Sequence, residues 1–493
     1  MGARSPEQEA GSGHGLAEEL SGGAGVNNLM RAREQTRGSS GNATTQLKRI
    51  LEANQRGEHT GIYSVCSANR AVLEAAMAQA LRVGSLLCIE STSNQVNQFG
   101  GYTGQTARDF AAFVGDLARE MRFPAGRIVL GGDHLGPHAW RSEKSIVAMA
   151  KARELVKSCV RAGYTKIHLD ASMRCADDGG ERQQPLEDRI VSARAAELCA
   201  AAEEAHKEMP QGSTPPLYVI GTEVPLPGGE QLEALAPETT STTNLARTIA
   251  ITKEAFAARG LHEAWERVIA VVVQPGVEFG DATVFPYQAS RAKKLAAFAG
   301  APGSLVYEAH STDYQTPGAL KEMVRDHFAI LKVGPWLTFA YREAVFALEA
   351  VEKEWLGATR GTSLSGVTDA LEAAMQENPS HWKNYHHGDE AALRIARKYS
   401  YSDRSRYYWG VETVRVALQK LTQNLEEHTA PVSLLSQFLP NQAAKIRAGE
   451  LANRPRDLIR SKICEVTSVY SFACGQSLAE KPRGRAGRRK TAC

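Results

Sequence analysis

Eight short apolar runs, separated by longer stretches with helical periodicity, constrain the fold of this chain more than any other feature. The runs are rich in Val, Ile, Leu and Tyr, as is typical of strands that are buried on both faces. The expected strands are residues 61–67, 85–91, 127–133, 166–170, 217–223, 268–275, 304–310 and 330–335. The expected helices are residues 68–81, 106–121, 142–161, 188–208, 243–259, 290–299 and 316–327. Strands that alternate with helices in this way predict a parallel sheet covered by helices.

A parallel sheet covered by helices can be a closed barrel or an open, doubly wound sheet. The number of strand–helix units and the absence of phosphate-binding motifs favour the barrel. Eight strand–helix units within about 275 residues match the size of a (β/α)8 barrel. An open, doubly wound sheet usually has a glycine-rich turn after its first strand, where this chain has Cys66-Ser67-Ala68-Asn69. The pattern G-x-x-x-x-G-K-[ST] is also absent from the sequence. We therefore predict an α/β protein, a (β/α)8 TIM barrel with a C-terminal helical extension.

Changes in amino-acid composition divide the chain into a leader, the barrel, a helical extension and a tail. Residues 1–42 are rich in Gly, Ser and charge and are expected to be a disordered leader, followed by the barrel at 43–338. Residues 339–474 combine helical patterns with many aromatic side chains, which predicts a helical extension packed on the barrel. Residues 475–493 are expected to be a disordered basic tail.

The distribution of charge argues against a nucleic-acid-binding protein. The net charge is +3, but six Lys and Arg lie in residues 481–493, which contain no acid, so the rest of the chain carries −3. A mildly acidic body does not suit a polyanionic partner. No run of about 18 apolar residues could span a membrane. The eight scattered cysteines form no C-x-x-C pair, which favours a reducing cytoplasm.

Polar side chains stand where the expected strands end, and in a barrel these ends meet at one mouth. They are Ser67, Asn69, Glu90, Asp133, His134, Asp170, Glu223, Gln274, Glu308, His310 and Lys332. Among them His134, Glu223 and His310 are typical metal ligands, and Gln274 or water could complete the coordination. Two imidazoles and a carboxylate favour Zn²⁺, with Mn²⁺ or Co²⁺ as alternatives, over Ca²⁺, which prefers oxygen ligands.

Carboxylates in the same set are candidate catalytic residues. Asp133 beside a metal could move the proton of the hydroxyl on a carbon–carbon bond that is being broken, while the metal polarises a ketone oxygen. Asp170 could orient a ligand or bind a substrate hydroxyl. Glu223 is a third catalytic candidate as well as a candidate ligand.

Other polar residues are candidates for substrate binding. Lys332 could be a Schiff-base nucleophile, but a cation that holds a substrate oxyanion or pairs with Glu308 is the simpler interpretation. An arginine pair in YSYSDRSRYYW could clamp a phosphate or could pack against helices. The candidate substrate contacts are Ser67, Asn69, Glu90, Lys332, Arg404 and Arg406.

Nine segments of the sequence resemble one family. They are GIYSVCSANRAVLEAAM, IESTSNQVNQFGGYTG, GGDHLGPHAW, AGYTKIHLDASMRCADD, GTEVPLPGG, VVQPGVEFGD, VYEAHSTDYQTP, LKVGPWLTFAYREA and YSYSDRSRYYW. In this order, from about residue 46 to about residue 440, they are similar to the GatZ/KbaZ family. Its members are known as the non-catalytic subunit of D-tagatose-1,6-bisphosphate aldolase and, under an older label, as tagatose-6-phosphate kinase.

The resemblance implies a TIM barrel related to the class II, metal-dependent aldolases. In that superfamily a strand-three Asp-His pair supplies the acid/base and a metal ligand, which implies these roles for Asp133 and His134. The segment AGYTKIHLDAS implies a supporting role for Asp170, and His310 stands where a late-strand metal histidine is expected. Gln274 replaces a metal-binding histidine of a glycine-rich phosphate loop, a departure that weakens the case for a complete aldolase.

Two functions share such a site. The first is a component of the tagatose-bisphosphate aldolase system, with a ketohexose or ketohexose phosphate as ligand and a catalytic aldolase chain as partner. The second is a stand-alone ketose or ketose-phosphate 4-epimerase, because inversion at C4 of a 2-ketose requires cleavage and re-formation of the C3–C4 bond. A kinase is disfavoured by the missing nucleotide loop, and a purely structural role is a further alternative. A homo-oligomer is compatible with either function.

Overall fold

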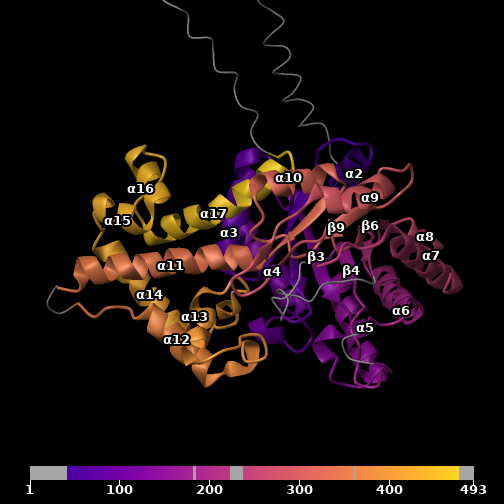
Figure 1. Ribbon diagram of the computed structural model, residues 1–493, viewed down its shortest axis with the longest axis horizontal. Coiled ribbons are helices and arrows are strands. Elements are labelled where there is room, and N and C mark those ends of the chain that lie inside the picture. The colour runs from indigo at the N-terminus through magenta and orange to yellow at the C-terminus, as the bar shows by residue number, and fades with distance from the viewer. Residues whose placement is uncertain (1–41, 181–184, 222–236, 359–361, 477–493) are drawn as a thin grey trace, which may run out of the picture. The chain divides into compact units, whose positions relative to one another are not determined.

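Eight parallel strands form a closed barrel in the order β1-β10-β9-β6-β5-β4-β3-β2 (Figure 1). The protein is seen in a computed structural model, which describes residues 42–180, 185–221, 237–358 and 362–476. The strands are β1 (Ile62–Cys66), β2 (Leu87–Thr92), β3 (Ile128–Leu135), β4 (Lys166–Leu169), β5 (Leu217–Ile220), β6 (Val268–Val272), β9 (Val306–Ala309) and β10 (Ile330–Val333). Each overlaps one of the expected strands, so the predicted (β/α)8 barrel is confirmed.

Helices cover the outside of the strands at the positions that the periodicity predicts. They are α3 (Arg70–Val83), α4 (Ala107–Glu120), α5 (Ser145–Arg161), α6 (Asp188–Lys207), α7 (Thr242–Ala258), α9 (Ala289–Ala299) and α10 (Pro317–Arg325), with a short α8 (His262–Trp265) after α7. Side-chain oxygens of Asn69, Thr106, Ser241 and Thr316 accept hydrogen bonds from the first backbone N–H groups of α3, α4, α7 and α10. These caps determine where each helix begins.

A further helix, α2 (Ala43–Gln55), closes the end of the barrel opposite the mouth. Leu47 and Leu51 are buried and belong to one hydrophobic cluster with residues from the strands, including Ile62 and Val129. Asn54 donates to the carbonyl oxygens of Thr60 and Val324 at 2.8 Å. The sequence pattern did not predict this helix, although the change of composition near residue 43 marks its start.

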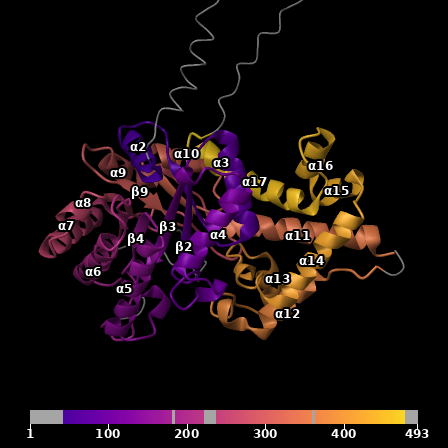
Figure 2. The same ribbon diagram turned by 180° about the vertical axis from the view of Figure 1, so that it is seen from behind.

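The helical extension starts directly at the end of the eighth strand and lies on one side of the barrel (Figures 1 and 2). The long helix α11 leads away from β10 and the shorter helices pack beside it. They are α11 (Pro335–Leu356), α12 (Val367–Glu377), α13 (Glu390–Tyr399), α14 (Glu412–Glu427), α15 (Val432–Phe438) and α16 (Pro440–Arg447). The helical patterns of residues 339–355, 363–378, 411–425 and 439–451 predict α11, α12, α14 and α16, whereas α13 and α15 lie outside the expected helices.

The last helix, α17 (Pro455–Ala473), returns to the barrel and packs against α3, α10 and α11 (Figures 1 and 2). The hydroxyl of Tyr470 donates to the carbonyl oxygen of Thr312 (2.8 Å), and its ring lies 5.8 Å from that of Tyr63 on β1. Gln476, just beyond the helix, donates to the carbonyl oxygen of Gly61 (3.1 Å). Residues 455–473 therefore complete the helical layer of the barrel, although the sequence-based division assigns them to the extension.

A small hairpin after β6 connects the barrel to the extension. It consists of β7 (Glu278–Phe279) and β8 (Val284–Phe285), which the sequence pattern did not predict. Between them Asp281 accepts hydrogen bonds from the hydroxyl of Ser400 (2.6 Å) and from Nδ1 of His386 (2.9 Å). Its carbonyl oxygen accepts from the backbone N–H of Tyr401 (2.9 Å). These contacts hold residues 386–401 close to the mouth of the barrel.

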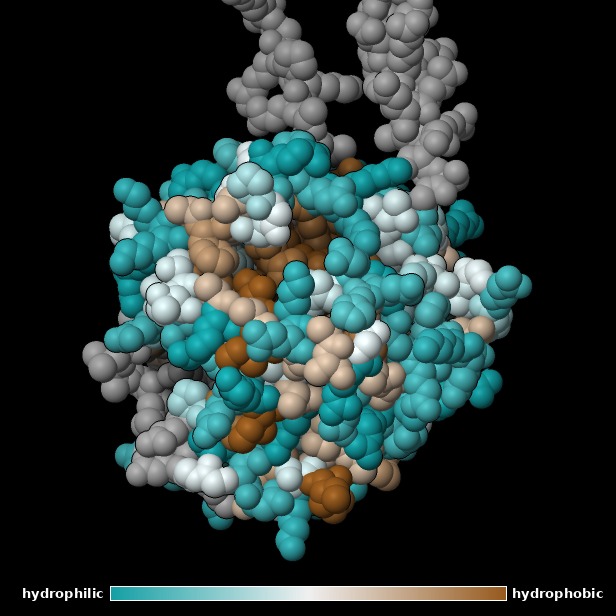
Figure 3. Space-filling model, turned by 90° about the vertical axis from the view of Figure 1, so that its right-hand side faces the viewer, coloured by the Kyte–Doolittle hydropathy of each residue, from teal (hydrophilic) through white to brown (hydrophobic). Residues whose placement is uncertain are grey.

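Hydrophilic side chains dominate one face of the molecule. The face shown in Figure 3 is largely hydrophilic, with hydrophobic residues interrupting it. No helix in the described ranges has both the length and the apolar character needed to cross a bilayer. The cysteines that the structure describes form no disulfide.

Candidate active site

Three imidazoles meet at the floor of the barrel mouth. His134 lies on β3, His168 on β4, and His310 directly follows β9. Their ring centroids are 4.8 to 5.2 Å apart, and all three side chains are buried. One ligand atom from each of Asp133, His168, Glu308 and His310 lies within 4.8 Å of the others. We call Asp133, His134, His168, Glu308 and His310 the imidazole cluster.

Carboxylates orient the imidazole rings of this cluster. Asp170 Oδ2 lies 2.7 Å from Nδ1 of His134, and Asp133 Oδ1 lies 3.0 Å from Nδ1 of His168. Glu308 Oε1 is 3.0 Å from Nε2 of His310. A carboxylate that holds one ring nitrogen and leaves the other available is the usual support of a metal-binding histidine.

The donor set of the imidazole cluster fits a divalent transition metal. Nε2 of His168 is buried and has no hydrogen-bond partner in the part of the chain that the structure describes. Buried polar atoms are nearly always paired, so such a nitrogen indicates a position where a ligand belongs. Imidazole nitrogens together with carboxylate oxygens suit Zn²⁺, Mn²⁺ or Co²⁺.

The electrostatics of the site keep its acids ionised. Burial alone would raise the pKa of Asp133, but His134, His168 and His310 outweigh burial and hold that pKa well below its usual range. The pKa of Asp170 is lowered against burial by its hydrogen bond with His134. Burial would lower the pKa of His134, but the two aspartates raise it to about 9. Asp133 is therefore a carboxylate at neutral pH and can accept a proton.

Beneath the cluster, two lysines and two glutamates form a buried charge network. Lys166 Nζ lies 2.5 Å from Glu90 Oε1 and 2.6 Å from Glu308 Oε2. Lys332 pairs with Glu90, and its Nζ lies 2.9 Å from Asp133 Oδ1. Glu90 is fully buried and does not line the cavity, so it acts as a counter-charge, in contrast to the predicted substrate contact. Lys332 lines the cavity, and its three carboxylate neighbours favour the ion-pairing role over a Schiff-base nucleophile.

An irregularity in β3 directs the side chains of Asp133 and His134. The pairing of β3 with β4 shifts register between Gly132 and Leu135, as at a β-bulge. Within this shift His134 adopts φ +50°, a left-handed conformation that costs free energy for a non-glycine residue. Bulges and strained residues of this kind commonly aim side chains at functional sites.

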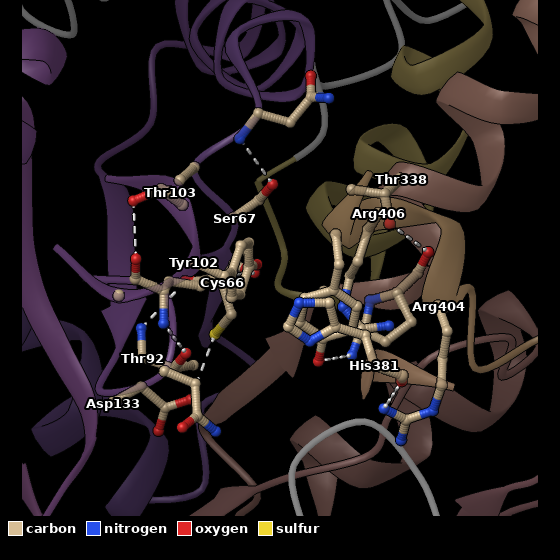
Figure 4. Close-up of a pocket in the computed structure, with 18 of the residues that line it drawn as sticks. Cys66, Ser67, Thr92, Tyr102, Thr103, Asp133, Thr338, His381, Arg404 and Arg406 are labelled. Carbon is tan, nitrogen blue, oxygen red and sulfur yellow. Dashed lines mark hydrogen bonds between the residues drawn. The ribbon is translucent and has the colours of Figure 1, made fainter. Parts of the chain in front are cut away.

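A cavity of about 1220 Å³ lies above the cluster, between the barrel mouth and the extension. Cys66 and Asp133 line its barrel side, and His381, Arg404 and Arg406 from the extension face them (Figure 4). A cavity of this size accommodates a small organic substrate. The extension is therefore one wall of the site.

Two residues that were expected as substrate contacts also line the cavity. Ser67 follows β1, and its hydroxyl accepts a hydrogen bond from the backbone N–H of Asn69 (3.2 Å). The side-chain oxygen of Asn69 accepts from the first N–H groups of α3, so this oxygen is committed to the helix cap. The hydroxyl of Ser67 and the amide nitrogen of Asn69 are the groups that could contact a ligand.

The predicted ligand Gln274 lies outside the cluster. Oε1 of Gln274 accepts hydrogen bonds from the backbone N–H groups of Gly276 (2.8 Å) and Val277 (3.1 Å), and the residue does not line the cavity. Its side chain therefore shapes its own loop, where Gly276 has φ +87°. Glu223 lies outside the described residues.

Sequence reasoning missed His168 and Lys166 because it considered only the ends of strands. Both lie within β4, in the segment Lys-Ile-His-Leu-Asp. Side chains alternate across a strand, so Lys166, His168 and Asp170 all point to the inside of the barrel. Three polar side chains at every second position of a short, otherwise apolar strand are the signal that could have found them.

The chain is similar to a described protein family and to several solved structures. Residues 47–475 match the family described as D-tagatose-1,6-bisphosphate aldolase subunit GatZ/KbaZ-like. A probable tagatose 6-phosphate kinase from Sinorhizobium meliloti 1021 is similar in structure, with 43% identity, a TM-score of 0.75 and coverage of 84% of this chain and 100% of that one. The YdjI aldolase of Escherichia coli K12 shares 13% identity over 78% of this chain and 98% of its own, with a TM-score of 0.36. The chain belongs to the GatZ/KbaZ-like family of D-tagatose-1,6-bisphosphate aldolase subunits.

Proposed function

We propose that this chain carries a working site for metal-dependent aldol and retro-aldol chemistry on the C3–C4 bond of a ketohexose or ketohexose phosphate. The observation that carries the proposal is the imidazole cluster, in which ligand atoms of Asp133, His168, Glu308 and His310 lie within 4.8 Å of one another and Asp133 is ionised. The family description, which names a bisphosphate aldolase subunit, supports the same class of substrate.

The residues of the cluster divide into ligands and a proton carrier. His168, His310 and Glu308, whose ligand atoms converge, would hold the cation, and His134, whose ring lies beside both imidazoles, is a further candidate ligand. Zn²⁺, Mn²⁺ and Co²⁺ suit these donors. When bound, a divalent cation supplies Lewis-acid polarisation of a carbonyl oxygen. Asp133 accepts the proton of the C4 hydroxyl when the bond breaks and returns it when the bond forms.

The surrounding residues keep Asp133 in position for that transfer. Lys332 Nζ, at 2.9 Å, and Nδ1 of His168, at 3.0 Å, both contact Oδ1 of Asp133. These contacts hold one carboxylate oxygen, so Oδ2 is the atom that handles the proton. Asp170 orients His134 from behind and takes no direct part in the transfer.

The test of this proposal combines metal analysis with an assay of the purified chain. The substrates are fructose, tagatose, their 6-phosphates and their 1,6-bisphosphates. Turnover should require a divalent metal and should fall by at least about 100-fold in Asp133→Asn, because the proton carrier is lost. Asp116→Asn, a change of an exposed aspartate on α4, is the matched control and should retain full activity. Absence of both metal and turnover, with and without a catalytic aldolase chain, would refute the proposal.

Within this chemistry, 4-epimerisation by the chain alone is favoured by the covered mouth. The extension forms a wall of the cavity, so an aldehyde fragment released from C3–C4 cleavage could be retained, turned and added back. Product analysis separates this activity from the subunit role. Interconversion of fructose and tagatose forms without release of trioses indicates an epimerase, whereas triose release only after addition of a catalytic partner indicates the aldolase subunit.

A further inference from the structure

Arg404 is a buried cation without an acid partner. It begins the 3₁₀ turn Arg404–Tyr407, lines the cavity, and exposes only 3% of its surface. Its Nη1 donates to the carbonyl oxygen of His381 (3.1 Å). Its Nε and Nη2 have no hydrogen-bond partner among the residues that the structure describes. These two nitrogens form the edge with which a guanidinium grips an anion through parallel hydrogen bonds.

The acid that precedes Arg404 in the sequence is turned away from the cavity. Asp403 adopts φ +43°, and its Oδ1 accepts from Nε of Arg342 (2.9 Å). Its Oδ2 accepts from the hydroxyl of Thr338 (2.5 Å). The carboxylate of Asp403 therefore pairs with Arg342 and Thr338 on α11. Arg404 is left without an acid partner among the described residues.

A second guanidinium strengthens the positive charge of this wall. Arg406 donates from Nη1 to the carbonyl oxygen of Asp403 (3.1 Å) and from Nη2 to the hydroxyl of Tyr407 (3.0 Å), and it forms no ion pair within the described ranges. The ring of Tyr385 supports Arg404, whose Cζ lies 3.0 Å from the ring centroid. Aromatic faces hold a guanidinium in place without neutralising it. Burial lowers the pKa of Arg404, as expected for a cation without a counter-ion.

We propose that Arg404, assisted by Arg406, binds the phosphate group of a phosphorylated ketohexose whose reacting carbons lie at the imidazole cluster. The placement of the reacting carbons at the imidazole cluster rests on the proposed function. Figure 4 places Asp133 on one side of the cavity and both arginines on the other, so a substrate in this cavity lies between them. Two guanidinium groups that form no ion pair among the described residues match a phosphate dianion, whereas a sugar carboxylate carries a single charge.

Binding measurements by titration calorimetry test this subsite separately from catalysis. The background is Asp133→Asn, in which turnover does not disturb the titration. D-fructose 6-phosphate should bind at least about tenfold more tightly than D-fructose, and inorganic phosphate should also bind. Arg404→Gln should reduce the affinity for the 6-phosphate to that for fructose and abolish phosphate binding. Arg415→Gln, which changes an exposed arginine on α14, is the matched control and should alter neither.

Thermal unfolding distinguishes a binding residue from a structural one. Because Arg404 has no acid partner, Arg404→Gln should leave the Tm of the ligand-free protein unchanged or raise it. The rise in Tm that phosphate causes in the parent protein should disappear in the variant. A lower ligand-free Tm combined with unchanged phosphate affinity would show that Arg404 is structural and would overturn the subsite.

The remaining outcomes separate this inference from the proposed function. Equal affinities for fructose and its 6-phosphate, with metal-dependent turnover intact, would overturn the subsite alone. Arg404-dependent phosphate binding without any metal-dependent turnover would keep the subsite and refute the proposed chemistry. Arg404-dependent binding of D-fructuronate as tight as that of the 6-phosphate would replace the phosphate with a carboxylate and overturn the proposal.

Discussion

At the residue scale, the position of Asp133 depends on groups that never meet a substrate. Glu90 reaches from β2 across β3 to Lys166, and glycine at position 131 makes this possible. A Cβ at Gly131 would lie 2.7 Å from Oε1 of Glu90, closer than side chains tolerate. Lys332 then bridges Glu90 and Asp133. The buried charge network therefore links the position of Glu90 on β2 to that of Asp133 on β3.

The first prediction concerns the stability that this network provides. Glu90→Gln should lower the free energy of unfolding by about 3 kcal/mol or more, because Lys166 and Lys332 keep their charges but lose a buried counter-charge. Urea unfolding followed by circular dichroism measures the change. Glu58→Gln, at an exposed pair with Arg56, is the control and should leave the curve unchanged. Coincident curves for Glu90→Gln and the parent would contradict the network's structural role.

At the element scale, α17 determines whether the barrel is complete. It occupies the place between α10 and α3 that an eighth helix fills in a (β/α)8 barrel, while α11, which follows the eighth strand, leads into the extension. Tyr470 anchors α17 through its ring contact with Tyr63 and its hydrogen bond to Thr312. The loop that carries His310 is thus held partly by a helix that lies about 150 residues further along the chain.

The second prediction tests this anchor. Tyr470→Ala should destabilise the protein by about 3–5 kcal/mol, because it leaves a cavity in the core and removes the hydroxyl that holds Thr312. Phe472→Ala on the same helix is the control, since Phe472 is 44% exposed and should change stability by about 1 kcal/mol or less. Thermal and urea unfolding measure both variants. Similar losses for the two would indicate that α17 is not an integral part of the barrel layer.

At the scale of the whole molecule, the sequence predicts the barrel well because its strands and helices have the right length and periodicity. Strand-end reasoning also found Asp133, His134, Asp170 and His310, since such residues need only their own strand to reach the mouth. Gln274 illustrates the limit of that reasoning, because a strand-end side chain can fold back onto its own backbone.

Other features depend on tertiary contacts that no local pattern records. The return of α17 is one of them, because a helix between two loops gives no sign of which neighbour it will join. The uncompensated charge of Arg404 is another, since it follows from the conformation of Asp403 and from the position of Tyr385. The sequence supplies the arginines but cannot show that their acids are used elsewhere.

The third prediction concerns removal of the metal from the folded protein. Chelation should lower the Tm and abolish turnover, and added Zn²⁺, Mn²⁺ or Co²⁺ should restore both, because a ligand that binds only the folded state stabilises it. At a metal concentration 100-fold above Kd the gain is about 2.7 kcal/mol. His310→Ala should lose this metal-dependent shift, whereas His428→Ala, at an exposed position, should keep it. Differential scanning fluorimetry measures the shift, and an equal shift in both variants would place the metal elsewhere.

The path of the chain through α11 and back through α17 has a consequence for synthesis on the ribosome. The extension is an insertion between the last strand of the barrel and its last helix, so about 140 residues must emerge after β10 before the barrel wall can close. At 5–20 residues per second this interval is on the order of ten seconds, during which the faces of α3 and α10 that α17 covers remain exposed. If translation stops within the extension, the apolar faces of α3 and α10 stay uncovered, and chaperones and proteases recognise such exposed surfaces. Completion of the polypeptide is thus required before the helical layer of the barrel can close.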